Sequence, residues 1–143
     1  MGYRSDVAYI IRFKDVSALR EFVAVNAINE GTRDALEECD VFIGSSDDYP
    51  ELRFAVDDVK WYPSFPDVQA HEELLAYFDR QEEPTAGYVF VRLGEENDDC
   101  MRVSGGDEDL APWDALDISR SIWWEVKPHT RSDKGTVAIV SEV

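Results

Sequence analysis

The stretch that decides the fold is PSFPDVQAHEELLAYFDRQEE, residues 63–83. Its apolar residues recur every three or four positions, which is the spacing of an α-helix that packs one side against a core. Asp67 stands before the apolar run and is expected to cap the helix, because its carboxylate can accept hydrogen bonds from free backbone amides. The side expected to face the core carries Val68, His71, Leu74, Leu75 and Phe78.

The segments around this helix alternate apolar and polar residues, as β-strands do. Residues 6–13, DVAYIIRF, predict the first strand, and Ser17 is placed to cap a helix that follows it. Strands at 39–44 and 51–56 are separated by turn-forming residues and predict a hairpin. Residues 87–93, GYVFVRL, predict a strand directly after the central helix.

The resulting order is β-α-β-β-α-β. It predicts an α+β fold of the ferredoxin-like split β-α-β type, an antiparallel sheet with two helices on one face. Extra C-terminal strands are expected at 100–104, at 117–127 as one strand, and at 136–140. Because the chain has 143 residues and no internal repeat, we expect a single domain over 1–143. The expected buried residues include Val7, Tyr9, Ile11, Phe54, Leu75 and Val89.

Charge is the strongest signal in the composition. The formal net charge is −17, and residues 30–117 carry 25 acidic and six basic side chains. Apolar residues make up 44% of the chain, so the acidic residues are expected on a folded body rather than a disordered one. The negative electrostatic field of such a chain repels nucleic acid and anionic membranes and attracts basic surfaces. We therefore expect a basic protein partner, with no direct nucleic-acid or membrane contact.

The acidic residues are densest in LGEENDDCMRVSGGDEDL, residues 93–110. If 87–93 and 100–104 form a hairpin, one group of carboxylates lies at each end of it, and together they make an extended acidic edge. Large aromatic residues are common anchors at the centre of an interface. The candidate partner-binding residues are Glu95, Glu96, Asp98, Asp99, Asp107, Glu108 and Asp109, with Trp61, Tyr62 and Trp123 as aromatic anchors.

Known catalytic and metal-binding patterns do not fit. The run HEELL at His71 resembles the zinc-protease motif HExxH, but Leu75 stands where the second ligand is required. His71 is better interpreted as a histidine at the edge of the helix's apolar side, and His129 as a solvated loop residue. No calcium-loop spacing and no nucleophile motif is present. The sequence predicts no catalytic residues, no metal ligands and no cofactor.

The cellular compartment is inferred from what is missing. No apolar run approaches the roughly 18 to 20 residues that span a bilayer, and the first ten residues lack the pattern of a signal peptide. Cys39 and Cys100 are the only cysteines and are far apart, which favours reduced thiols. These features predict a cytoplasmic protein.

Three stretches resemble one known family. MGYRSDVAY (1–9), VKWYPSFPDVQAHEELLAYFD (59–79) and SRSIWW (119–124) are together similar to a family of small, largely uncharacterised acidic proteins of tailed bacteriophages. The resemblance supplies no catalytic residues. It implies a phage accessory protein in the bacterial host cytoplasm, and many such proteins bind and disable host machinery.

Three functions follow from these observations. The first is an inhibitor that binds a basic host surface, such as that of a defence or nucleic-acid-processing enzyme. DNA mimicry of the anti-CRISPR or anti-restriction type is one form that such inhibition can take, beside allostery and sequestration. The second is a protein that binds or sequesters a small cationic ligand. The third is an accessory of phage structure or assembly. An enzyme is not expected.

Overall fold

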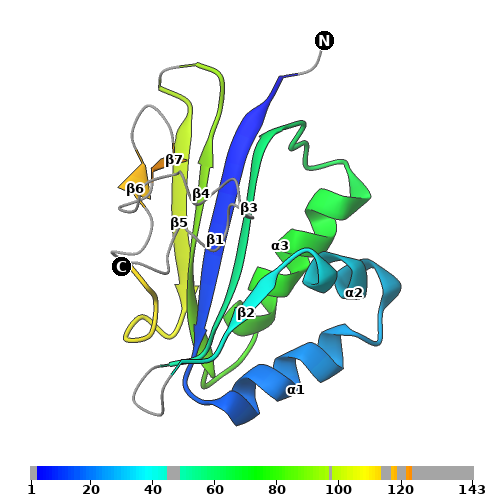
Figure 1. The fold of residues 1–143 in the computed structure, drawn as a ribbon, viewed down its shortest axis with the longest axis vertical. Helices are drawn as coiled ribbons and strands as arrows, with labels where there is room; N and C mark the ends of the chain where they lie inside the picture. Colours follow the sequence, from blue (N-terminus) through cyan, green and yellow to red (C-terminus); the bar gives the residue numbers. More distant parts are fainter. Residues whose placement is uncertain (1–2, 45–48, 97, 114–116, 119–121, 124–143) are drawn as a thin grey trace.

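The computed structural model of the chain describes residues 3–44, 49–96, 98–113, 117–118 and 122–123. Figure 1 shows the helices and strands along the chain. The helices are α1 (Val16–Asn26), α2 (Glu30–Glu37) and α3 (Pro66–Asp79). The strands are β1 (Ser5–Phe13), β2 (Asp40–Phe42), β3 (Glu51–Val59), β4 (Ala86–Leu93), β5 (Cys100–Gly106), β6 (Asp117–Ile118) and β7 (Ile122–Trp123).

Five strands form one open antiparallel sheet in the order β2-β3-β1-β4-β5. β1 is central, and its Tyr9 is level with Phe54 of β3 and Phe90 of β4. The predicted α+β class and the antiparallel sheet are confirmed, and so are the two predicted hairpins, β2–β3 and β4–β5. In Figure 1 the three helices lie to the same side of the sheet.

The described chain has three helices, where the sequence predicts two. The additional helix is α2, whose sequence EGTRDALE is mostly polar and turns only Thr32, Ala35 and Leu36 toward the core. It begins because the side chain of Asn29 accepts hydrogen bonds from the backbone amides of Gly31 and Thr32, at 2.8 and 3.4 Å. It is held by packing of Thr32 and Ala35, the two buried residues of the helix. Local capping and packing therefore form α2 although its inward side is short and only weakly apolar.

Two predicted helix caps are each wrong by two residues. α1 is capped by Asp15, whose carboxylate accepts from the amide of Ala18 at 2.8 Å, and not by Ser17. α3 begins at Pro66 after Phe65, whose side chain has no acceptor and makes no cap. Proline suits the first helical position because its φ angle is already helical and its missing amide needs no partner. Asp67 lies inside the first turn instead.

The main core lies between the sheet and the helices. Phe13, Phe22 and Phe78 pack together with ring centroids 4.9 to 5.7 Å apart and join β1 to α1 and α3. The six residues predicted to be buried are confirmed as buried. Five of them, Val7, Tyr9, Ile11, Phe54 and Leu75, belong to this core.

The sixth, Val89, lies on the other face of the sheet. Ala8 and Ile10 of β1 and Val89 and Val91 of β4 alternate with the core residues, and none is more than 1% exposed. β7 contacts both β1 and β4. Both faces of the two central strands are therefore buried, which explains why β1 is an almost uninterrupted apolar run rather than an alternating one.

The C-terminal strands differ from the single strand predicted at 117–127. Ile118 of β6 is level with Ile122 of β7, so these two residues belong to two short strands that pair with each other. The remainder of 117–127, and the strand predicted at 136–140, lie outside the described residues. Among the described residues, no helix has the length and apolar character needed to cross a membrane.

Candidate functional site

The seven predicted carboxylates of the hairpin form two groups rather than one edge. Leu93 is level with Cys100 at one end of the β4–β5 hairpin, and Gly87 with Gly106 at the other. The two ends are about 20 Å apart, the length of a seven-residue strand. No acidic residue lies on β5 between them. We call the first the loop group (Glu95, Glu96, Asp98, Asp99) and the second the post-β5 group (Asp107, Glu108, Asp109).

Two members of the loop group hold the N-terminal segment of the protein in place. Asp99 accepts from the guanidinium of Arg92 at 2.8 Å and from the hydroxyl of Tyr3. The hydrogen bond from Arg92, and then that from Tyr3, keeps the pKa of Asp99 below its ordinary value. Glu95 accepts from the backbone amide of Arg4 at 2.6 Å. Because these carboxylates already accept hydrogen bonds within the protein, Asp99 and Glu95 have less capacity to bind a partner.

The post-β5 group is organised around a turn. The carboxylate of Asp107 accepts from the amide of Asp109 at 2.9 Å, while Glu108 and Asp109 are exposed. The end of α3 lies beside this group, because the hydroxyl of Tyr88 donates to Asp79 at 2.8 Å and a side chain added at Gly105 would contact both residues. Asp79 therefore extends the post-β5 group.

The predicted aromatic anchors are largely used inside the fold. Trp61 is half-buried against Phe54 and Phe90, with ring centroids 6.1 and 6.4 Å away. The hydroxyl of Tyr62 accepts from the backbone amide of Tyr3 at 2.7 Å. Trp123 lies in β7, and its side chain is outside the described part of the protein.

Other large apolar side chains are exposed at the surface. On β5, Met101 and Val103 are each 42% exposed, and Trp113 follows shortly after the strand. The guanidinium of Arg102 lies 5.9 Å from the Trp113 ring and donates to its carbonyl oxygen. Sequence reasoning missed this set, although the alternation of Met101, Arg102 and Val103 was the available signal.

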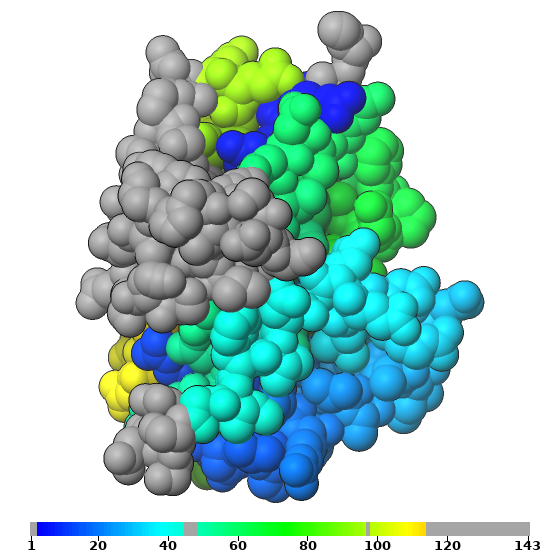
Figure 2. All heavy atoms as spheres, in the orientation of Figure 1, coloured from blue at the N-terminus to red at the C-terminus, as the bar shows by residue number. Residues whose placement is uncertain are grey.

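A larger acidic surface lies on the helices. Residues 14–38 and 66–83 carry twelve acidic and four basic side chains, and all twelve acidic ones are exposed. Figure 2 shows part of the surface that α1, α2 and α3 form beside the sheet. We call this set, which has eight members within the helices and four next to their ends, the acidic helical face: Asp15, Glu21, Glu30, Asp34, Glu37, Glu38, Asp67, Glu72, Glu73, Asp79, Glu82 and Glu83.

A cleft of about 240 Å³ lies within this face, between α2 and α3. Small residues such as Gly31, Ala35 and Ala70 form part of its wall. Its polar lining consists of the side chains of Asp34, Glu38, Asp67 and His71. Three carboxylates around a small cleft favour an amine or a guanidinium as an occupant.

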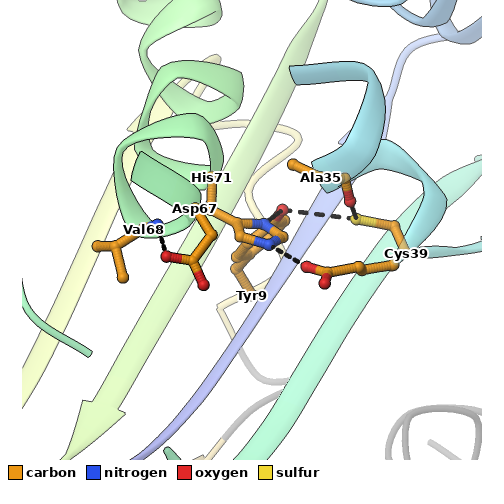
Figure 3. Close-up of polar contacts among 7 residues, drawn as sticks. Tyr9, Ala35, Cys39, Asp67, Val68 and His71 are labelled. Atoms are coloured by element: carbon orange, nitrogen blue, oxygen red, sulfur yellow. Dashed lines mark hydrogen bonds and ion pairs between the residues drawn. The ribbon is translucent and has the colours of Figure 1, made fainter. Parts of the chain in front are cut away.

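His71 connects this cleft to the core (Figure 3). Its Nε2 lies 2.7 Å from a carboxylate oxygen of Glu38, and its Nδ1 lies 2.8 Å from the hydroxyl of Tyr9. The Tyr9 hydroxyl is also 3.5 Å from Sγ of Cys39, which lies 3.4 Å from the carbonyl oxygen of Ala35. The four side chains thus form one chain of polar contacts from the surface at Glu38 to the fully buried Tyr9.

The contacts define the protonation of this cluster. A carboxylate oxygen only accepts, so Nε2 of His71 carries a proton and Nδ1 of the neutral ring accepts from Tyr9. Burial lowers the pKa of His71, and the hydrogen bond to Glu38 opposes that shift. Burial raises the pKa of the Cys39 thiol to about 12 and that of Tyr9 well above its ordinary value. At neutral pH this cluster therefore contains a thiol and a neutral imidazole, and no activated nucleophile.

No group of three or more His, Cys, Asp or Glu side chains is arranged to hold a metal ion within the described ranges. Comparisons with protein-family models, with curated proteins and with solved structures find no match for this chain. Its own residues must therefore carry the functional argument.

Proposed function

We propose that the protein is a non-enzymatic accessory protein of a tailed bacteriophage that binds and inhibits a host protein through a basic surface. The partner would be a defence or nucleic-acid-processing enzyme in the bacterial cytoplasm. The acidic helical face carries this proposal, because eight exposed carboxylates within the three helices and four next to their ends belong to one fold.

The helices position these carboxylates at defined spacings. A basic groove that binds duplex DNA meets about one charge per 1.7 Å of helix axis, and a rigid acidic surface can compete for the same arginines and lysines. Only four basic side chains share the helical segments, and one of them, Arg80, pairs with Glu73 at 3.0 Å. Repulsion among the remaining carboxylates would be relieved on binding a positive surface.

We also infer that the fold is a ferredoxin-like split β-α-β sandwich with β5 as an added edge strand. The order β2-β3-β1-β4, with every neighbouring pair antiparallel, supports this assignment. α1 and α2 occupy the first connection, and α3 the second. The fold alone does not indicate the function.

Capture of host proteins on the immobilised protein tests the proposed function. The expected partner binds at about 50 mM salt, is released at about 500 mM salt as screening shortens the reach of charge, and is itself a nucleic-acid-binding protein. Adding the phage protein to the purified partner should displace its nucleic acid. Glu37→Lys with Glu72→Lys should weaken displacement at least tenfold, and Arg20→Glu should not. Capture of phage particle proteins, or no displacement of nucleic acid, would contradict the proposal.

A second candidate function is the binding of a small cationic ligand in the α2–α3 cleft. It is favoured by the three carboxylates of Asp34, Glu38 and Asp67 around that cleft. Titration with spermidine or arginine should then raise the melting temperature, and Asp34→Asn should abolish the increase. An equal increase in Asp34→Asn would indicate general screening of charge instead of a site.

A further inference from the structure

The outer edge of β5 presents backbone groups without a partner strand among the described residues. β5 ends the five-stranded sheet and has seven residues, whereas β2 at the opposite edge has three. Short edge strands, prolines and inward-pointing charges are the usual protection against pairing with another chain. β5 has no proline, and its only charged side chain is Arg102.

The hydrogen bonds at the two ends of the hairpin identify the groups that face outward. The amide of Gly94 donates to the carbonyl of Asp99 at 2.8 Å, and the amide of Asp107 donates to the carbonyl of Ala86 at 2.9 Å. Hydrogen-bonded and non-hydrogen-bonded pairs alternate along an antiparallel ladder. Met101 and Val103 therefore bond to β4. The outward N–H and C=O groups belong to Arg102 and Ser104, whereas the amide of Cys100 donates to the carbonyl of Asp98 at 3.1 Å.

The side chains next to this edge set the character of an added strand. Met101 and Val103 point to one face and are each 42% exposed. Arg102 points to the other face and is held against Trp113. Apolar residues of an added strand would pack favourably beside Met101 and Val103. A basic residue beside Arg102 would be repelled.

The charges at the two ends of β5 indicate which strand can bind. The loop group lies at one end and the post-β5 group at the other. A second copy of this protein, paired through β5 in either direction, would bring carboxylates against carboxylates at both ends. An extended segment with lysines or arginines at both ends meets opposite charges instead.

We propose that β5 accepts an extended segment of the partner as a sixth strand, with basic residues at its ends and apolar residues beside Met101 and Val103. This rests on the proposed function, since the segment belongs to the same basic partner. Backbone hydrogen bonds supply the affinity in such strand addition, and the side chains beside Met101 and Val103 supply the specificity.

The peptide Lys-Lys-Thr-Val-Thr-Val-Thr-Lys-Lys, labelled at one end, is the probe. Its fluorescence anisotropy at about 50 mM salt is expected to show saturable binding, and backbone amide exchange at Arg102 and Ser104 should slow when it binds. Ser104→Pro removes an outward amide at an edge position, where proline is tolerated, and adds bulk in the path of the strand. It should weaken binding at least tenfold, whereas Ser104→Ala should bind within twofold of the unmodified protein.

Two further measurements distinguish this inference from the proposed function. Circular dichroism shows whether Ser104→Pro is folded, and a peptide N-methylated at its edge-facing positions tests the same hydrogen bonds without changing the protein. If N-methylation and Ser104→Pro leave binding unchanged while salt and Glu108→Lys weaken it, strand addition is overturned and only attraction to the post-β5 group remains. The proposed function fails on a different result: Glu37→Lys with Glu72→Lys leaves the displacement of nucleic acid from the partner unchanged.

Discussion

Tyr9 is the residue on which the buried polar cluster depends. Its hydroxyl lies within hydrogen-bonding distance of His71 and Cys39, and the side chain is completely buried. Tyr9→Phe leaves Nδ1 of His71 without a donor, so it should lower the free energy of unfolding by about 1–3 kcal/mol. Urea unfolding measures this. Tyr49→Phe, at an exposed tyrosine, is the control and should change stability little.

His71 makes stability depend on pH in a known direction. Its pKa in the folded protein lies below the ordinary value of 6.5 because it is buried. Between these two values the unfolded chain binds a proton that the folded chain does not, so stability falls as pH decreases through this window and is fully present above it. The carboxylates of Glu38 and Asp67 oppose the pKa shift.

His71→Gln tests this dependence. Unfolding free energies measured between pH 7.5 and 5 should decline for the unmodified protein, and the decline should be smaller for the variant. An equal decline would assign the effect to other groups.

Asp99 affects stability in a more acidic range. Because its pKa in the folded protein is lowered from 3.8, its contribution to stability is present above that value and is lost as the pH falls further.

The contacts between individual residues were only partly predictable from the sequence. The burial of His71 follows from its place on the apolar side of α3, but its partners Tyr9 and Glu38 lie 62 and 33 positions away. The pairing of Asp99 with Tyr3 spans 96 positions. Contacts of this length depend on strand register, which a local pattern does not specify.

At the scale of elements, periodic helices and strands were predictable and polar ones were not. α3 and the long strands β1, β3 and β4 carry many buried apolar residues, whereas α2 is mostly polar. The stability of α3 follows from that pattern. Leu75→Ala should lower the free energy of unfolding by about 2–5 kcal/mol, because Leu75 lies in the core. Glu72→Ala on the exposed side of α3 is the matched control, and an equal loss there would contradict the packing argument.

The cap of α1 gives a sharper test at the same scale. Asp15→Ala removes the acceptor for the amide of Ala18 and should lower stability by about 0.5–2 kcal/mol. Ser17→Ala, the position that the sequence alone favours, should have almost no effect. Thermal or urea unfolding of the two variants decides between them, and the reverse result would mean that α1 begins two residues later.

For the whole molecule, the net charge of −17 is the dominant property. Repulsion between carboxylates is screened by salt, so the melting temperature should rise as KCl increases from about 10 to 500 mM. Scanning calorimetry measures the rise, and an uncharged osmolyte of equal osmolality is the control. A melting temperature that ignores KCl would show that the carboxylates are too far apart to destabilise the fold.

The charge excess was evident from the sequence, but its distribution was not. The hairpin appeared to be the main acidic site because its acidic residues are consecutive. The acidic helical face instead combines residues from three helices that are separate in the sequence. Its recognition required the tertiary arrangement.

The central position of β1 has a consequence for how the protein is made. β1 leaves the ribosome before β3 and β4, yet it pairs with β3 up to Val59 and with β4 up to Leu93. During synthesis, therefore, one edge of β1 stays unpaired until β4 has left the ribosome as far as Leu93. Such non-local pairing slows folding and exposes a strand that other chains can capture. The nascent chain is thus most vulnerable to aggregation while β4 is still inside the ribosome.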